Sequence, residues 1–187
     1  MPESAARPLL FLDVDGPLIP FGPPPDDSPG GHPVHPPAPG RPDDETANPL
    51  LARINPDHGR RLAALPCELV WATTWMAEAN DVIAPRLGLP RLPVVIWQDA
   101  EAGAGGPAER YRPRGLHWKT RPLVAWAAGR PFIWVDDEIT GTDRRWVRAH
   151  HPGTALLHRV DPRRGLTDAD YGVLREWLHG RPGPYPA

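Results

Sequence analysis

A short apolar run at residues 9–12 leads directly into the sequence Asp13-Val14-Asp15-Gly16 near the start of the chain. An uninterrupted apolar run of this length, closed by a glycine, is typical of a strand buried inside a parallel sheet. Open α/β sheets bind their ligands at the carboxyl ends of such strands. Two carboxylates in that position are costly unless they pair with a cation or take part in a reaction. The segment therefore predicts an α/β fold with a polar site at the end of its first strand.

Three interpretations of the segment Asp13-Val14-Asp15-Gly16 differ in what they require from the rest of the chain. A calcium loop of the EF-hand type needs a further oxygen ligand where Pro17 stands, and a distal glutamate that is absent. A solvated turn requires nothing more, since Asp-Gly is a common turn sequence. A metal-assisted phosphoryl-transfer site requires further acids, a hydroxyl and a cation at the ends of later strands.

Three later segments supply those groups in chain order. Two of them are apolar, strand-like runs, and the third precedes a helical pattern. The groups are the hydroxyls of Thr73 and Thr74 after residues 68–72, the ammonium of Lys119, and the carboxylates of Asp136 and Asp137 after residues 132–135.

The four motifs, in this order, resemble those of the haloacid dehalogenase (HAD) superfamily. In that superfamily a strand ending in Asp-x-Asp is followed by a strand ending in Thr or Ser, a lysine before a helix, and a strand ending in acids. The resemblance covers residues 9–137. It implies a Rossmann-like three-layer sandwich with a central, mainly parallel sheet, helices on both faces and a minimal cap. Strands that alternate with helices agree with this, and the length of 187 residues predicts a single HAD-like domain over residues 1–187.

The resemblance also implies a reaction, which is hydrolysis of a phosphomonoester through an aspartyl phosphate. Asp13 would be the nucleophile, and Asp15 the general acid and then the general base. Thr73 would bind the phosphoryl oxygens, and Thr74 would contribute only a backbone N–H. Lys119 would neutralise the phosphoryl group and keep Asp13 ionised.

Carboxylates this close together require a cation, and Mg²⁺ prefers hard oxygen ligands. By resemblance the ligands are Asp13, the backbone carbonyl of Asp15, and either Asp136 or Asp137, between which the sequence does not decide. The superfamily often has a further acid four residues after the acids of the fourth motif.

In this chain the position of that further acid is occupied by Thr140 or Gly141, and we interpret the nearby Asp143 as a helix cap. The departure leaves the affinity for the metal open, although it does not affect the nucleophile.

Lys119 is the only lysine in a chain whose other basic residues are all arginine. A compact ammonium fits beside a phosphoryl group and a carboxylate where a planar guanidinium would not. The unique lysine therefore favours a functional role over a chance position at a helix end.

Residues 17–49 contain 12 of the 28 prolines and cannot bury a core. This composition predicts a long extended flap or a disordered insertion. Its place directly after the first motif is where the superfamily carries the flap or cap over its active site. A lid and a passive insertion both remain open.

Further elements follow from local signals. We expect one helix over residues 76–87 ending at Gly88, and a strand over residues 92–97. We also expect a helix capped by Thr120, a helix capped by Thr142 or Asp143, and a last helix opened by a capping box at residues 167–170.

Five of the eight tryptophans lie in or beside the expected strands and motifs, and they form two groups. Trp71, Trp97 and Trp134 fall within expected strands, which predicts that they are core residues. Trp75 and Trp118 flank the second and third motifs, where they would either bind substrate by stacking on a nucleobase or simply pack.

The pattern Trp-Ala-Thr-Thr-Trp, followed by Ala79-Asn80 and later by Gly165-Leu166-Thr167, resembles a subgroup of HAD domains associated with RNA-repair proteins. This implies a phosphorylated small molecule or a nucleic-acid end as the partner. The net charge of −2 indicates no global basic field for nucleic acid.

The cysteine content and the length of the apolar segments indicate in which cellular compartment the protein is expected. The single cysteine, Cys67, excludes a disulfide within the chain, and no segment has the length of a membrane span. We therefore expect a soluble cytoplasmic protein without a membrane partner, and nothing in the sequence indicates a protein partner.

Two alternatives are set against the phosphatase. A catalytically silent HAD domain that acts as a binding module would be expected to lose the nucleophile, whereas Asp13 is present. A dehalogenase would lack the second acid of the first motif, whereas Asp15 is present.

Overall fold

The computed structural model describes residues 7–22, 49–97 and 115–180. In this part of the chain the centre is a four-stranded parallel sheet with the order β2-β1-β3-β4. Its strands are β1 (Leu9–Leu12), β2 (Glu68–Trp71), β3 (Phe132–Asp136) and β4 (Ala155–Arg159). The predicted α/β architecture is therefore confirmed, with the Asp13 strand β1 inside the sheet.

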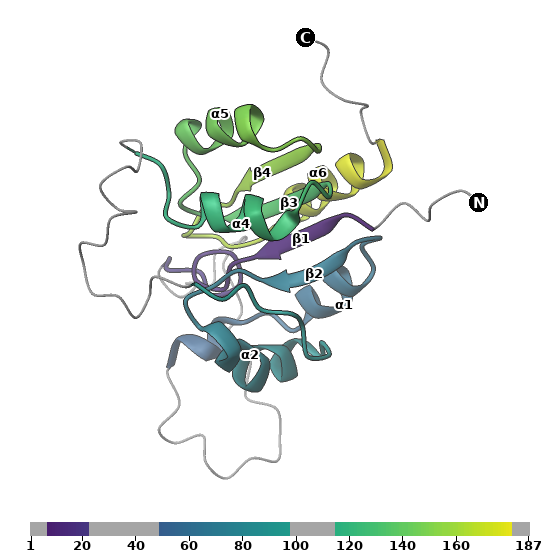
Figure 1. Cartoon of the computed structure of the whole chain (residues 1–187). Coiled ribbons are helices and arrows are strands. Elements are labelled where there is room, and N and C mark those ends of the chain that lie inside the picture. The colour runs from purple at the N-terminus through teal and green to yellow at the C-terminus, as the bar shows by residue number, and fades with distance from the viewer. Residues whose placement is uncertain (1–6, 23–48, 98–114, 181–187) are drawn as a thin grey trace.

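Helices cover both faces of the sheet, which gives three layers (Figure 1). Helices α4 and α5 pack on one face, and α1, α2 and α6 pack on the other. The α-helices are α1 (Asp57–Ala63), α2 (Ala79–Leu87), α4 (Thr120–Ala127), α5 (Gly141–His150) and α6 (Asp168–Gly180), and the 3₁₀ helices are η2 (Pro49–Arg53) and η3 (Met76–Glu78).

Strand β1 joins the two halves of the core. Leu10 and Leu12 pack into the cluster under α1, α2 and α6, whereas Leu9 and Phe11 pack into the cluster under α4 and α5. All four side chains are completely buried, and such burial contributes about 1.5–3 kcal/mol for each large apolar side chain. Burial on both faces explains why the strand is apolar throughout.

Two of the expected elements differ from the structure. Residues 92–97 form no strand, and only a single bridge joins Val94 to Trp71. The helix expected over residues 76–87 begins as η3 and continues as α2, with Met76 at a positive φ of 49°. Its predicted end is confirmed, because Gly88 adopts the left-handed conformation that closes α2.

Helix starts also differ from expectation at two places. Thr140, and not Thr142 or Asp143, is the N-cap of α5, and Asp143 is the N3 residue of a capping box with it. The residue before α4 is Lys119, and Thr120 is the first helical residue. The capping box expected at the start of α6 is confirmed by the hydrogen bonds between Thr167 and Asp170.

The Pro-rich segment of residues 17–49 lies mostly outside the described residues, so its expected role as a lid or insertion stays a prediction. Its first six residues are described and are fixed to other parts of the fold. The backbone N–H of Leu166 donates to Pro17 O, and Arg53 Nη1 donates to Pro20 O and Gly22 O at 2.8 and 2.9 Å. The segment thus leaves the first motif along a defined path.

No helix among the described residues is long and apolar enough to cross a membrane.

Candidate functional site

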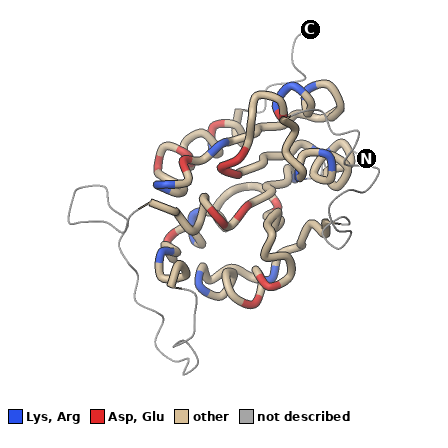
Figure 2. Tube along the Cα trace, turned by 90° about the vertical axis from the view of Figure 1, so that its left-hand side faces the viewer, with Lys and Arg blue, Asp and Glu red and all other residues tan. Residues whose placement is uncertain are grey.

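The carboxyl ends of three neighbouring strands bring the predicted motifs to one edge of the sheet. The backbone N–H of Asp13 donates to Val135 O at 3.1 Å, and the N–H of Ala72 donates to Leu12 O at 2.9 Å, so the three strands end in register. Figure 2 views the molecule from this edge, where acidic segments gather near the middle of the trace. Asp13, Thr73 and Asp136 therefore occupy the position at which open α/β sheets bind ligands.

Lys119 is the cation at the centre of this edge. Its Nζ lies 2.7 Å from Asp13 Oδ2 and 2.8 Å from Asp136 Oδ2. Only 2% of the lysine is exposed. Because the residue lies at the N-terminus of α4, the chain carries the ammonium inward between the ends of β1 and β3. The structure thus joins the first, third and fourth motifs through two buried ion pairs.

Burial determines the charge balance of these groups. Removal from water raises the pKa of Asp13 to about 7, although the ammonium of Lys119 acts in the opposite direction. Burial lowers the pKa of Lys119, but the carboxylates of Asp13 and Asp136 outweigh it and raise that pKa above its ordinary value. The lysine is therefore held as a cation. Any further positive charge nearby would favour the ionised form of Asp13.

The two adjacent acids at the end of β3 have different environments. Asp136 is completely buried, and its carboxylate accepts from Lys119 Nζ, from Trp134 Nε1 at 3.2 Å and from the backbone N–H of Glu138 at 2.9 Å. Asp137 is half-buried and lies against Gly16. Burial and the neighbouring Asp136 raise the pKa of Asp137.

The donor set fits a hard divalent cation. Asp13, Asp136 and Asp137 each offer a carboxylate oxygen, and these oxygens lie within 4.8 Å of one another. When all groups are ionised, three carboxylates and the one ammonium of Lys119 give the cluster a formal charge of −2. Mg²⁺ takes carboxylate oxygens as ligands and would balance that negative charge. The acidic cluster is therefore able to hold a metal.

Asp15 and the second motif are linked by Trp75. The indole Nε1–H of Trp75 donates to Asp15 Oδ2 at 3.0 Å, and its backbone N–H donates to Thr73 Oγ1 at 3.3 Å. Thr73 is completely buried, whereas Thr74 is exposed. The structure thus places Thr73 at the inner side of the motif and Thr74 at the surface.

Trp118, for which the sequence left stacking on substrate and simple packing open, packs edge-on against Trp97 with ring centroids 4.8 Å apart. Its ring centroid also lies 5.4 Å from Lys119 Nζ, within the range of a cation–π contact. The expected core positions of Trp71, Trp97 and Trp134 are confirmed, since all three are buried.

Sequence reasoning assigned no role to His117. Its Nδ1 accepts from the backbone N–H of Lys119 at 3.2 Å, and its Nε2 lies 2.9 Å from Glu138 Oε2. His117, Asp136 and Glu138 form a second group with ligand atoms close together. The only available signal was that His117 stands two residues before the unique lysine.

Asp143 does more than cap α5. Its carboxylate accepts from the backbone N–H of His117 at 2.8 Å and from Thr120 Oγ1 at 2.6 Å, as well as from Thr140. Burial raises its pKa, but these hydrogen bonds outweigh burial and hold the pKa below its ordinary value. Asp143 therefore ties the start of α5 to the segment that carries Lys119.

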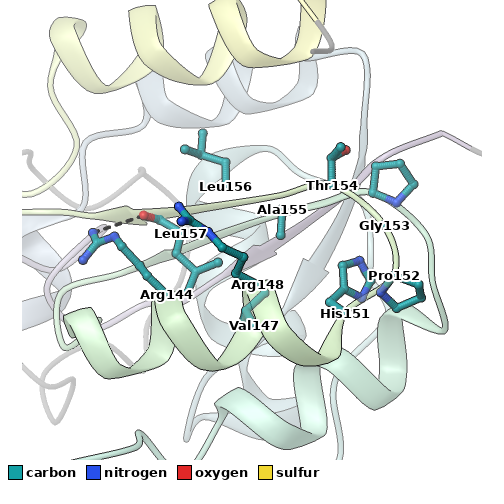
Figure 3. Close-up of a pocket in the computed structure, with 11 residues that line it drawn as sticks. Arg144, Val147, Arg148, His151, Pro152, Gly153, Thr154, Ala155, Leu156 and Leu157 are labelled. Carbon is teal, nitrogen blue, oxygen red and sulfur yellow. Dashed lines mark hydrogen bonds between the residues drawn. The ribbon is translucent and has the colours of Figure 1, made fainter. Parts of the chain in front are cut away.

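A cavity of about 580 Å³ lies elsewhere, between α5 and the outer strand β4 (Figure 3). Arg144, Arg148 and His151 line it together with residues 154–157. Arg144 Nη2 donates to Leu157 O. None of the predicted site residues lines this cavity.

A parallel sheet with paired acids, a threonine and a buried lysine at its carboxyl edge is the architecture of the HAD-type hydrolases. Residues 9–171 match the family model described as the HAD domain in Swiss Army Knife RNA repair proteins. The chain belongs to this family, which confirms the subgroup expected from its sequence. Neither the curated proteins nor the solved structures gave a match.

Proposed function

We propose that this protein is a Mg²⁺-dependent phosphomonoesterase that works through an aspartyl phosphate on Asp13. The observation that supports the proposal is the pair of contacts from Lys119 Nζ to the carboxylates of Asp13 and Asp136 at 2.7 and 2.8 Å. A carboxylate held beside a buried ammonium at a strand end is placed to attack phosphorus and to have the phosphoryl charge neutralised.

The reaction has two steps on the side chains of this protein. In the first, a carboxylate oxygen of Asp13 bonds to phosphorus while the bond from phosphorus to the leaving oxygen breaks, and Asp15 gives that oxygen its proton. In the second, Asp15 takes a proton from water as the water oxygen bonds to phosphorus, and the bond to Asp13 breaks. Free phosphate and the original two carboxyl groups result. Lys119 and the Thr73 hydroxyl hold the phosphoryl oxygens in both steps.

The metal ligands in this proposal are Asp13, the backbone carbonyl of Asp15 and Asp137. We assign Asp137 as the ligand from the fourth motif because three donors already occupy the carboxylate of Asp136. Bound Mg²⁺ would offset the charge of the acids and of the phosphoryl oxygens.

We propose a terminal phosphate on a nucleic acid as the first substrate to test, since the family is named for RNA repair proteins. Nucleotides and small phosphomonoesters are the comparison set. Oligoribonucleotides with a 3′- or a 5′-phosphate, assayed beside free nucleotides at equal concentration, would rank these classes. A preference for small phosphomonoesters over both oligonucleotides would contradict this choice.

Hydrolysis of p-nitrophenyl phosphate, with Mg²⁺ or with EDTA, tests the proposed reaction. We expect turnover that requires Mg²⁺ and that is lost in Asp13→Asn. Asp57→Asn is the matched control, because Asp57 is an exposed carboxylate paired with the exposed Arg60 in its own helix. Turnover that persists in Asp13→Asn would contradict the aspartyl phosphate.

A second measurement does not depend on the choice of substrate. Beryllium fluoride binds a nucleophilic aspartate as a mimic of the phosphorylated state. We expect it to stabilise the wild type against thermal unfolding in the presence of Mg²⁺, and to leave Asp13→Asn unchanged. Absence of stabilisation in the wild type, together with absence of turnover, would favour the silent binding module.

A further inference from the structure

Trp75 contacts the proposed general acid directly, although it is 60 residues away in the sequence. The indole Nε1–H donates to Asp15 Oδ2 at 3.0 Å, within the normal range for a hydrogen bond. An indole N–H donates and cannot accept, so Trp75 can hold a carboxylate but cannot exchange protons with it. The contact therefore fixes one oxygen of Asp15 and leaves the other for the reaction.

The backbone around Trp75 is built to keep the indole in this position. Its own N–H donates to Thr73 Oγ1, and its carbonyl accepts from the N–H of Glu78 at 3.0 Å. Met76 has a φ of 49°, a backbone conformation that residues other than glycine rarely adopt. The ring also packs on the core cluster under α1, α2 and α6. This turn therefore directs Trp75 back towards the end of β1.

A general acid must lie within hydrogen-bond reach of the oxygen that it protonates, and small displacements cost rate. Asp15 follows β1 at a turn, where its side chain is only partly buried. A fixed donor on a neighbouring strand end is a way to restrict its rotamers. This role differs from both alternatives that the sequence left open for Trp75, stacking on substrate and simple packing, neither of which requires the N–H.

We infer that Trp75 is a positioning residue, which holds the carboxylate of Asp15 in the orientation for proton transfer to the leaving oxygen. The inference rests on the proposed phosphomonoesterase function. Trp75 acts through Asp15 and takes part in no bond change itself. The feature that matters is the indole N–H. The substitution Trp75→Phe removes this donor and keeps an aromatic ring at the same position.

The dependence of rate on the leaving group distinguishes this role from packing. Nitrophenolate leaves as a stable anion without a proton, whereas the alkoxide of glycerol 2-phosphate must be protonated as it leaves. We expect Trp75→Phe to reduce kcat/KM on glycerol 2-phosphate by roughly tenfold or more, a part of the usual contribution of general acid catalysis. The ratio kcat/KM reports the steps up to release of the leaving group, and so it excludes the later hydrolysis of the aspartyl phosphate, which both substrates share. On p-nitrophenyl phosphate we expect a much smaller loss.

Two comparisons make the test specific. Trp177→Phe is the matched control, since Trp177 is also partly buried and packs on the same core cluster, but in α6. In the background of Asp15→Asn, Trp75→Phe should cause no further loss, because the group that it positions is already gone. Equal losses in kcat/KM on both substrates, or losses that add to that of Asp15→Asn, would overturn the inference.

The indole signals in a ¹H–¹⁵N spectrum provide a readout without turnover. The Trp75 signal, identified by its absence in Trp75→Phe, should move in Asp15→Ala, while that of Trp177 should not. A Trp75 signal that stays in place would also overturn the inference. Failure of the phosphomonoesterase proposal would be recognised separately, from wild type and Asp13→Asn alone.

Discussion

Gly16 and Asp137 lie so close that a Cβ atom built on Gly16 would be 2.6 Å from Asp137 Cγ. Gly16 also has a φ of +84°, a backbone conformation that residues other than glycine rarely adopt. The turn after the first motif therefore accommodates the acid of the fourth motif only when residue 16 has no side chain.

Gly16→Ala should consequently displace Asp137 from the acidic cluster. We expect a higher Mg²⁺ concentration for half-maximal turnover and a loss of about 1–2 kcal/mol in unfolding free energy from the positive φ. Mg²⁺ titration of activity and urea unfolding measure the two effects. Gly172→Ala is the control, because no atom lies near its Cβ position in α6, and alanine should raise stability by about 0.5–1 kcal/mol. An unchanged Mg²⁺ requirement in Gly16→Ala would argue against Asp137 as a ligand.

Lys119→Arg should reduce kcat by roughly 100-fold or more, the scale expected when a stabilising donor is lost from an active site. A guanidinium is too wide for a buried site in which Nζ contacts both Asp13 and Asp136. Steady-state kinetics on p-nitrophenyl phosphate would measure the loss, and thermal melts would show whether the variant folds. The reverse change Arg60→Lys, in an exposed ion pair, should leave both unchanged. Full activity in Lys119→Arg would show that the chemistry does not need an ammonium.

Asn80→Ala should destabilise the fold. Asn80 is buried, accepts from Trp71 Nε1 at 3.1 Å, and exchanges hydrogen bonds with the backbone of Leu92 at 2.8 and 2.9 Å. Removal leaves buried groups without partners, at a cost of about 2–4 kcal/mol in urea unfolding. The neighbouring Asp81→Ala removes an exposed ion pair with Arg91 and should cost less than about 1 kcal/mol. Equal losses in the two variants would contradict a structural role for the Asn80 amide.

The stability of the protein should fall at acid pH partly through Asp143. Hydrogen bonds from Thr120, Thr140 and His117 outweigh burial and lower the pKa of Asp143 below its ordinary value of 3.8. A lowered folded-state pKa contributes stability that is present above the unfolded-state value and is lost as pH falls through the folded-state pKa. Urea unfolding of wild type and Asp143→Asn should therefore differ most above about pH 4 and converge at lower pH. A difference that stays constant over the whole range would contradict the assignment.

Local signals explain why the ends of β1 and β3 could be predicted from the sequence. Each strand is an apolar run that ends in acids, and burial on both faces leaves little choice for the residues in between. The end of α2 could also be predicted from a local signal, because Gly88 alone sets the left-handed C-cap. The capping box at Thr167 needed only a spacing of three residues.

The failures have physical reasons in particular residues. Residues 92–97 have the apolar character of a strand, but Pro93 has no N–H to donate to a neighbouring strand. The backbone N–H and carbonyl of Leu92 are already hydrogen-bonded to the side chain of Asn80. The cap at Thr140 went unrecognised because that position was compared with an acid of the superfamily, although Asp143 follows at capping-box spacing.

Contacts within the candidate site were the least predictable part. The bond from Trp75 to Asp15 depends on the turn at Met76, and the bond from Trp134 to Asp136 depends on two rotamers at the end of β3. Neither follows from residue types or their spacing, since both need the strands to be aligned first.

The ion pair between Asp13 and Lys119 joins residues 106 positions apart, across most of the described fold. During refolding, such a long-range contact forms only after a large loop has closed. On the proposed function, turnover would therefore report completed assembly, and a fluorescence change in the core should precede the return of activity. A growing chain that has not yet reached residue 119 contains Asp13, the proposed nucleophile, but lacks the ammonium that pairs with it. On this proposal, catalysis would not begin before the rest of the fold has formed.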